Sequence, residues 1–411
     1  MQTIALTQKR TRYETIVLSL LSKMNKGSID ITLPSGELVQ LGNGADSTHA
    51  SVTITDYRFF EMCVLYGDIG FGESYTNGFW DTDSITNVIK WFLLNIDSAP
   101  TLSGSKMKAG IVNILKLVNR IKHSFRKNDL TTAKSNIAEH YDLNNDFFRL
   151  FLDPTMTYSS AYFENAEIDL TKAQIAKYES LCKSMKIKPG DHVLEIGSGW
   201  GGNAIHLAKN HACKVTTVTI SEEQYKFAKE RIEEEKLSEK IEVKLMDYRL
   251  ITGQFDKIIS IEMLEAVGHE FFDVFFKKCH DLLKPKGVLG FQVITCPDSR
   301  YDSLRKGVDW IQKHIFPGSL LPSVSALNTS INRTGEMSLM NLKEMGLHYA
   351  QTLRIWRKKF NENLDEIRKL GFDEKFIRKW NYYFCYCEAA FDMRNISVMQ
   401  MVYTRPNNLD F

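Results

Sequence analysis

Hydrophobic and polar positions in the first part of the chain alternate between helical and strand periodicities. Apolar residues recur at helical spacing over Tyr13–Met24, which predicts an amphipathic helix. Apolar and polar residues alternate over Ser28–Gln40 around a Pro-Ser-Gly turn, which predicts a β-hairpin. Ser51–Thr55 predicts another strand, and Arg58–Tyr66 and Ser84–Ile96 are apolar enough to form buried helices. Together these elements predict a small α+β domain, which we expect over residues 1–128.

From about Leu170 the pattern becomes a regular alternation of strands and helices. The predicted strands are His192–Ile196, Lys214–Thr219, Ile241–Met246, Lys257–Ile261 and Val288–Ile294. The predicted helices between them include Ala204–Lys209, Glu222–Glu235 and Glu270–Leu283. Strand–helix alternation implies right-handed crossovers and a mainly parallel sheet. The fold class predicted for residues 129–411 is therefore α/β, with a Rossmann-like sheet.

The stretch Ser105–Asn128 is rich in basic residues and carries an apolar stripe at helical spacing. The basic residues are Lys106, Lys108, Lys116, Arg120, Lys122, Arg126 and Lys127. A basic amphipathic helix can lie on an anionic bilayer, with its apolar face inserted and its cations near phosphates. A core-facing helix with a solvated basic face has the same pattern, so both interpretations stay open.

Composition and charge narrow the function classes. With 52 Lys and Arg against 50 Asp and Glu, the net charge of +2 gives no reason to expect nucleic acid as a partner. No apolar run reaches the length of a membrane-spanning helix, and the first residues do not resemble a signal peptide. The 7 cysteines form no CxxC pair, so we expect neither a disulfide framework nor a metal site. We expect a cytoplasmic protein, with peripheral attachment to membranes.

A glycine-rich turn follows the first strand of the predicted sheet. Glu195, Gly197, Gly199 and Gly201 give the pattern Glu-x-Gly-x-Gly-x-Gly at the end of a strand, before a helix. Glycines there let backbone approach a ligand at the carboxyl end of the strand. The pattern resembles motif I of the class I methyltransferases, which bind S-adenosylmethionine. A glycine turn without a ligand is the alternative.

Two later strand ends carry polar residues in the order that such a fold requires. Thr219, Ile220 and Gln224 follow the second strand, where the resemblance implies contacts to the ribose. Asp247 and Tyr248 follow the third, where Asp247 could accept a hydrogen bond from the adenine amino group. Each set could also consist of helix caps and turn residues.

Longer motifs resemble the cyclopropane-fatty-acyl-phospholipid synthase family over about Lys127–Arg405. The segments that carry the resemblance are His140–Asp146, Leu152–Phe163 with Tyr158 and Ser159, Ser260–Gly268, Tyr301-Asp302, Ile315–Gly318 and Leu321–Ser323. The resemblance implies transfer of a methylene group from S-adenosylmethionine to the cis double bond of a phospholipid acyl chain. The alkene takes the methyl group, and a base then removes a proton from that methyl so that the ring closes. The family's base is a bound bicarbonate, held by Cys, Glu, His, a backbone group near an Ile, and Tyr.

Carried over residue by residue, the bicarbonate shell is partly changed. Glu265, Tyr349 and Ile294 match the family's glutamate, tyrosine and isoleucine. Ser160 replaces the cysteine and Gln292 replaces the histidine, and the glutamine resembles the plant-type branch. Both can still hydrogen-bond an anion, Ser160 through its hydroxyl and Gln292 through its amide.

Simpler roles stay open for several of these residues. Glu265 could cap a helix, and Tyr349 could be a core tyrosine. Cys387 aligns with a cysteine once taken as the family nucleophile, but alkene chemistry needs no covalent enzyme intermediate, so a structural role is expected. Aromatic residues expected to line or support an acyl tunnel, or simply to form core, are Trp310, Phe316, Trp356, Trp380, Tyr382 and Tyr383.

The predicted partners are unsaturated phospholipid acyl chains and a membrane surface, and a homodimer is possible. Two other enzyme activities compete: methylation of an alkene without ring closure, and methylation of a small-molecule nitrogen. A lipid-binding protein with an inactive methyltransferase domain is the alternative outside enzymes. The intact glycine turn and Glu265 argue against it.

Overall fold

The computed structural model describes residues 10–44, 46–97, 145–165 and 168–411. Its first part is a small sheet in the order β2-β1-β3-β4. The strands are β1 (Ser28–Thr32), β2 (Leu38–Gly42), β3 (His49–Ile54) and β4 (Trp80–Asp81). The predicted hairpin is confirmed, because β1 and β2 pair antiparallel, whereas β1 and β3 pair parallel.

Three helices accompany this sheet, and all three were expected from the sequence. They are α1 (Arg12–Leu21), α2 (Arg58–Thr76) and α3 (Ile85–Leu94). Helix α2 is longer than predicted and contains a kink at Gly67, where φ is 61°. Ser84 accepts a hydrogen bond from the backbone N–H of Asn87 and so caps α3.

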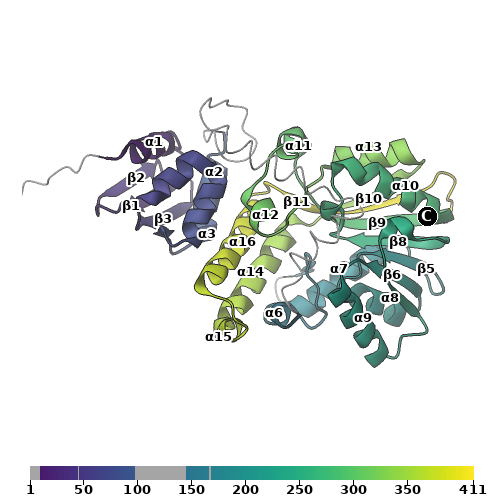
Figure 1. Ribbon diagram of the computed structural model, residues 1–411. Coiled ribbons are helices and arrows are strands. Elements are labelled where there is room, and N and C mark those ends of the chain that lie inside the picture. Colours follow the sequence, from purple (N-terminus) through teal and green to yellow (C-terminus); the bar gives the residue numbers. More distant parts are fainter. Residues whose placement is uncertain (1–9, 45, 98–144, 166–167) are drawn as a thin grey trace, which may run out of the picture.

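The second part is a seven-stranded sheet in the order β10-β11-β9-β8-β5-β6-β7 (Figure 1). Its strands are β5 (His192–Ile196), β6 (Lys214–Thr219), β7 (Ile241–Leu245), β8 (Phe255–Ile261), β9 (Leu283–Thr295), β10 (Ser338–Glu344) and β11 (Ser397–Thr404). Strands β5 to β9 pair parallel, which confirms the predicted α/β class. The sequence patterns did not predict β10 and β11, which pair antiparallel at one edge.

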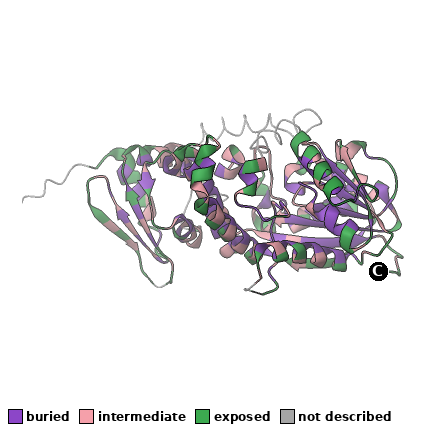
Figure 2. Ribbon diagram, turned by 90° about the horizontal axis from the view of Figure 1, so that it is seen from below, coloured by how far each residue is buried: buried purple, intermediate pink, exposed green. Residues whose placement is uncertain are grey.

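Helices connect the strands of the large sheet and cover it. They are α6 (Asn145–Arg149), α7 (Leu170–Ser184), α8 (Gly202–Asn210), α9 (Glu222–Glu234), α10 (Phe272–Leu282), α11 (Asp298–Leu304), α12 (Trp310–His314), α13 (Val324–Thr334), α14 (Gly346–Glu362), α15 (Leu364–Lys369) and α16 (Glu374–Asp392). Short 3-10 turns lie at Tyr248–Leu250, Leu264–Ala266 and His269–Phe271. The strands of the large sheet are mostly buried, while the helices keep exposed residues on their outer sides (Figure 2).

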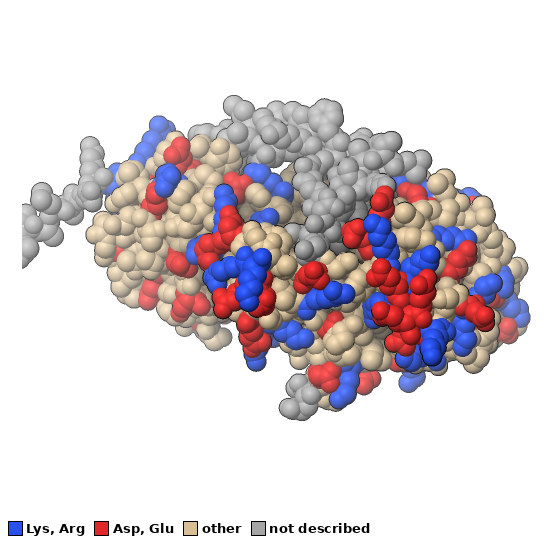
Figure 3. Space-filling view, turned by 60° about the horizontal axis from the view of Figure 1, so that its bottom comes forward, with Lys and Arg blue, Asp and Glu red and all other residues tan. Residues whose placement is uncertain are grey.

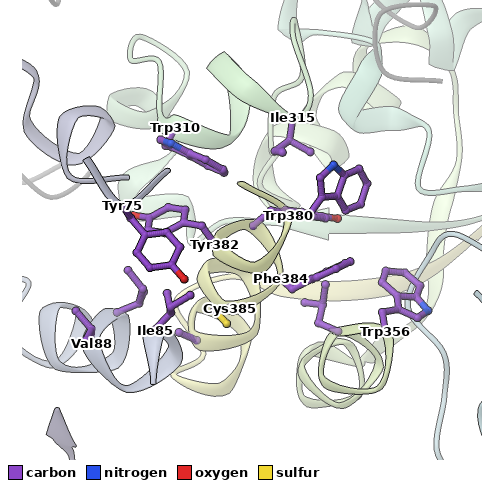
Figure 4. Close-up of a cluster of buried hydrophobic side chains, with 14 of the residues drawn as sticks. Tyr75, Ile85, Val88, Trp310, Ile315, Trp356, Trp380, Tyr382, Phe384 and Cys385 are labelled. Carbon is purple, nitrogen blue, oxygen red and sulfur yellow. The ribbon is translucent and has the colours of Figure 1, made fainter. Parts of the chain in front are cut away.

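Helix α16 joins the two parts of the molecule through a shared apolar core. Its aromatic residues face Tyr75, Ile85 and Val88 of the first part on one side (Figure 4). Trp310 and Trp356 approach the same helix from α12 and α14. Arg378 of α16 reinforces the junction by donating to the carbonyls of Tyr75 and Trp80. The position of α16 beside both sheets follows from this packing.

On the molecular face drawn in Figure 3, Lys and Arg lie interspersed with Asp and Glu. The basic stretch over residues 105–128 and the expected domain boundary at residue 128 lie outside the described residues. Among the helices of the described ranges, none combines the length and apolar character needed to cross a membrane.

Candidate functional site

The predicted site residues gather at the carboxyl ends of the parallel strands. The glycine turn follows β5, Thr219 ends β6, and Asp247 follows β7. Glu265 follows β8, and Ile294 lies near the end of β9. Carboxyl ends of parallel strands share one edge of a sheet, so the topology brings together residues that are far apart in sequence.

The glycine turn adopts backbone conformations that need glycine. Gly197, Gly199 and Gly201 have φ values of 98°, 49° and 85°. A Cβ added at Gly197 would lie 3.3 Å from the Met263 side chain, whereas one at Gly199 would meet no atom of the described residues within 4 Å. The space beside Gly199 is therefore left free by the protein, as a cradle for a ligand that approaches the backbone requires.

Glu195 lies beneath this turn, in the protein interior. Its carboxylate accepts from Asn203 Nδ2 at 2.8 Å and from Thr217 Oγ1 at 2.5 Å. Burial raises the pKa of Glu195 to about 7, against the lowering effect of these two donors. Glu195 thus ties β5 to β6 and α8.

The ends of β6 and β7 are organised by local hydrogen bonds. Thr219 Oγ1 bonds Gln224 Oε1 at 3.0 Å and accepts from the Ser221 N–H, which leaves Ile220 at the turn between strand and helix. Asp247 accepts from Arg249 Nε at 2.8 Å and from its Nη2 at 2.6 Å.

The hydrogen bonds at the ends of β6 and β7 limit which side-chain atoms are available to a bound nucleoside. The Arg249 guanidinium holds the pKa of Asp247 below its usual value despite partial burial, so the carboxylate stays ionised. Tyr248 packs its ring on Phe275 with 5.3 Å between centroids. Any adenine contact from Asp247 must therefore share oxygens that Arg249 already occupies.

Tyr158 and Ser159 lie on the segment that precedes α7, across from the strand ends. The Tyr158 hydroxyl donates to that of Tyr383 at 3.0 Å, and its ring lies 5.2 Å from that of Trp356. Ser159 Oγ accepts from Lys177 Nζ at 2.6 Å. Lys177 is fully buried, and burial lowers its pKa to about 7. The sequence analysis did not single out this lysine.

Glu265 is buried, and its two oxygens have different surroundings. Oε1 accepts from the Ile294 backbone N–H at 2.5 Å. Oε2 is buried and has no hydrogen-bond partner among the residues that the structure describes. Burial, with the nearby charge of Glu262, raises the pKa of Glu265 to about 8. Glu265 thus holds a proton at neutral pH, and its position is not that of a solvated helix cap.

A second glutamate, Glu262, lies in the same site. It belongs to the motif Ser260–Gly268, but the sequence analysis assigned it no role. Its Oε1 accepts from the Ser160 backbone N–H at 2.9 Å and from Gln292 Nε2 at 2.7 Å. The Tyr349 side chain also hydrogen-bonds it. The signal available in the sequence was the spacing Glu-Met-Leu-Glu directly after a buried strand.

The structure changes how Ser160 can act. Its hydroxyl donates to the Ala161 carbonyl at 3.0 Å, so its backbone N–H, not its hydroxyl, reaches the site. Gln292 is fully buried and completely engaged, since its Oε1 accepts from Gln400 Nε2 at 3.1 Å. The expectation that a buried Gln292 needs partners is confirmed.

Aromatic rings surround the carboxyl groups. Tyr349 stacks on Phe391 with 4.7 Å between centroids and meets Trp356 edge-on at 5.9 Å. Phe316, on the loop after α12, lies 6.3 Å from the Tyr158 ring. Of the residues expected near an acyl tunnel, Phe316 is partly exposed. The remaining five, Trp310, Trp356, Trp380, Tyr382 and Tyr383, are buried in close-packed core.

Cys387 lies on α16, and burial raises the pKa of its thiol. A thiol that keeps its proton is a poor nucleophile, which agrees with the structural role expected. Away from the site, Cys182, His206 and His211 place possible metal-ligand atoms within 4.8 Å of one another. The Nε2 atoms of His206 and His211 lie 2.8 and 2.9 Å from Glu179 Oε1.

The sheet order, the glycine turn and the polar strand ends define a class I S-adenosylmethionine-dependent methyltransferase. The family profile described as mycolic acid cyclopropane synthetase matches residues 128–401. The chain belongs to this family of cyclopropane synthases and related lipid methyltransferases.

Two curated relatives cover most of the chain. Tuberculostearic acid methyltransferase UfaA1 of Mycobacterium tuberculosis is 36% identical over 83% of this chain and 79% of its own length. Cyclopropane-fatty-acyl-phospholipid synthase of Escherichia coli is 35% identical over 87% of this chain and 89% of its own. The two names describe different products, so the family alone does not fix the product.

Solved structures support the same fold. The cyclopropane synthase MmaA2 of Mycobacterium tuberculosis covers 68% of this chain and 100% of its own, with a TM-score of 0.63 and 30% identity. Mycolic acid cyclopropane synthase CmaA1, complexed with SAH and CTAB, covers 66% of this chain and 98% of its own, with a TM-score of 0.61 and 30% identity. Coclaurine N-methyltransferase, at 22% identity and a TM-score of 0.63, shares the fold.

Proposed function

We propose that this enzyme transfers a methylene group from S-adenosylmethionine to the cis double bond of an unsaturated phospholipid acyl chain, forming a cyclopropane. The observation that carries the proposal is the pair of carboxyl groups, Glu262 and Glu265, beside the glycine turn. Met263, between them, faces Gly197. An amine can give up its proton to water after methylation, but a methyl group attached to a carbocation needs a fixed, buried base.

The chain offers a cradle for S-adenosylmethionine at the glycine turn. Gly197 and Gly199 would admit its amino-acid end, and Thr219, Gln224 and Asp247 end the strands where its nucleoside would lie. When bound there, S-adenosylmethionine supplies an electrophilic methyl group on a positively charged sulfur. The open space beside Gly199 is the structural observation that fits this ligand.

The aromatic residues have a distinct task in this proposal. An alkene is a poor nucleophile, so it must be aligned with the methyl group in a site that excludes water. Tyr158 and Phe316, which are only partly buried, provide apolar walls, and their ring faces would stabilise the carbocation that follows methyl transfer. A small soluble amine would need no such enclosure.

The two carboxyl groups have different protonation tendencies. The charge of Glu262 adds to burial in raising the pKa of Glu265, which therefore stays protonated near pH 7. Burial also raises the pKa of Glu262, against the lowering effects of the Lys177 charge and of hydrogen bonds from Gln292 and the Ser160 N–H. Carboxyl groups whose environments differ in this way provide an acid and a base in one site.

A methyl-branched product is the second candidate, because UfaA1, a relative that covers most of the chain, is named a tuberculostearic acid methyltransferase. The same carbocation would then lose a proton from the acyl chain. The experiment is incubation of the enzyme with unsaturated phospholipid vesicles and S-adenosylmethionine, followed by proton NMR of the extracted lipid. Upfield ring-methylene signals support the cyclopropane; olefinic signals with a new branch and no ring protons would replace it by the second candidate.

We further propose peripheral binding to anionic membranes through the basic stretch Lys106–Lys127. Each cation near the surface contributes about 1 kcal/mol, an attraction that salt weakens. Changing Lys116, Arg120 and Lys122 to Glu should weaken sedimentation with anionic vesicles and make it less salt-dependent. Vesicle binding that ignores both salt and the reversal would contradict this role.

A further inference from the structure

Glu262 has an unusual backbone conformation directly after β8. Its φ is 49°, in the left-handed region that residues with side chains rarely adopt. Its backbone N–H donates to the Gln292 carbonyl at 2.8 Å, which fixes this turn against β9. Strained residues of this kind persist where the surroundings over-determine them, and they cluster at functional sites. The backbone conformation of Glu262 therefore indicates that its side chain has a functional role.

The Glu262 carboxylate meets three of the residues that the resemblance places around bicarbonate, with Ser160 donating through its backbone N–H and not through the expected hydroxyl. The Ser160 backbone N–H and Gln292 Nε2 donate to its Oε1 at 2.9 and 2.7 Å, and Tyr349 hydrogen-bonds the same carboxylate. Of the remaining shell, the Ile294 N–H donates to Glu265. The Ser160 N–H, Gln292 Nε2, Tyr349 and the Ile294 N–H are therefore engaged by carboxyl groups of the chain itself.

A separate bicarbonate does not fit this arrangement. It would have to displace Glu262 from these hydrogen bonds, and its charge would add to that of an adjacent carboxylate in a buried site. A glutamate carboxylate has the same planar pair of anionic oxygens as bicarbonate and accepts from the same kinds of donor. Buried Lys177 supplies the compensating positive charge.

Building on the proposed function, we infer that the Glu262 carboxylate takes the place of bicarbonate as the base of this enzyme. In the proton-transfer step, a C–H bond of the transferred methyl breaks. Its electron pair forms the C–C bond that closes the ring, and the proton goes to the Glu262 carboxylate. The proton then passes to water before the next turnover. Burial raises the pKa of Glu262 above its usual value, which makes its carboxylate a stronger base.

Bicarbonate dependence tests this assignment directly. Turnover of wild-type enzyme is measured on unsaturated phospholipid vesicles in buffer freed of carbon dioxide, and again with added bicarbonate. We expect the two rates to agree within about twofold. A wild-type enzyme that transfers methyl groups only when bicarbonate is added would overturn the assignment while leaving the proposed function intact. No transfer to unsaturated phospholipid under either condition would instead contradict the proposed function.

Two substitutions at Glu262 distinguish the loss of the carboxylate from the opening of the space that it fills. Glu262→Ala opens room for a small anion between Ser160, Gln292 and Tyr349, so turnover should fall on the order of 10²-fold and recover with formate or bicarbonate. Glu262→Gln fills the same space with an amide that is no base, so its turnover should stay low with either anion. Near wild-type turnover of Glu262→Gln in bicarbonate-free buffer would overturn the assignment.

Glu14→Gln is the matched control, because Glu14 is also a buried glutamate but caps α1 in the first part of the chain. A glutamine at this capping position makes the same backbone contact, so turnover should be unchanged. S-adenosylmethionine affinity, measured by calorimetry, reports whether each Glu262 variant is folded at the cofactor end. If Glu262→Ala does not bind it, Glu262→Gln, which preserves the side-chain volume, carries the test.

Discussion

The site lies along one edge of the large sheet, and its two halves differ in the groups that they contain. At the ends of β5, β6 and β7, polar side chains bond one another and the backbone of the glycine turn borders open space. At the ends of β8 and β9, the carboxyl groups of Glu262 and Glu265 lie close enough for the charge of Glu262 to add to burial in raising the pKa of Glu265. The first half leaves room for a ligand; the second concentrates ionisable groups.

This difference separates binding from proton transfer. A ligand that lies on backbone needs the absence of side chains, which glycine supplies. A base that works on a methyl group needs a carboxylate removed from water, which requires donors and a counter-charge around it. We therefore expect changes in the β5–β7 half to affect affinity and changes in the β8–β9 half to affect turnover.

The largest expected effect is the loss of cofactor binding in Gly199→Val. The new side chain would enter the space that the protein leaves free, so affinity for S-adenosylmethionine should fall by at least about 100-fold. Gly190→Val is the control, because Gly190 also has a positive φ and open space beside it but precedes β5 away from the glycine turn. Calorimetry that finds equal affinities for the two folded variants would remove the cofactor half of the comparison.

In contrast to Gly199→Val, Glu265→Gln should lower turnover and leave the affinity for S-adenosylmethionine nearly unchanged. Turnover should fall on the order of 10²-fold, as for removal of an acid–base group, while affinity for S-adenosylmethionine changes by less than about twofold. The amide oxygen can still accept from the Ile294 N–H, so the fold should be preserved. Single-turnover rates and calorimetry check the two quantities. Normal turnover would assign Glu265 to structure alone.

A smaller effect concerns stability against pH. Folding raises the pKa of Glu265 from 4.5 to about 8, so between these values the folded chain holds a proton that the unfolded chain has lost. Stability should therefore fall as pH rises through this window, by at most about 1.4 kcal/mol per pH unit for one group. Urea unfolding of wild type and Glu265→Gln from pH 5 to pH 8 measures it. The variant should lose part of this pH dependence of stability. Identical slopes for the two proteins would mean that folding does not raise the pKa of Glu265.

Much of the cofactor half could be predicted from the sequence because its signals are local. Strands β5 and β6 have the predicted bounds, and the glycine turn is a contiguous motif after a strand. Alternation of strands and helices predicted the parallel pairing of β5 to β9. Strands β10 and β11 were missed because they pair antiparallel at the edge, outside the alternation of strands and helices.

The carboxylate half depends on contacts that no local pattern contains. The Ser160 N–H reaches Glu262 across 102 residues, and Gln292 reaches it across 30. The sequence did not single out Lys177, because its complete burial depends on how α7 packs. Whether the Ser160 hydroxyl or its backbone N–H meets the site is set by a rotamer, which the sequence does not encode locally.

The most direct measurement is the fate of the methyl hydrogens. Enzyme, unsaturated phospholipid vesicles and S-adenosylmethionine with a fully deuterated methyl group are combined, and the product lipid is examined by mass spectrometry together with proton and deuterium NMR. The account predicts that one deuteron is removed from the transferred methyl group. The product should then carry two deuterium atoms, both on an upfield ring carbon. A product that retains all three deuterium atoms on a methyl branch would contradict the account, because the proton would then have come from the acyl chain.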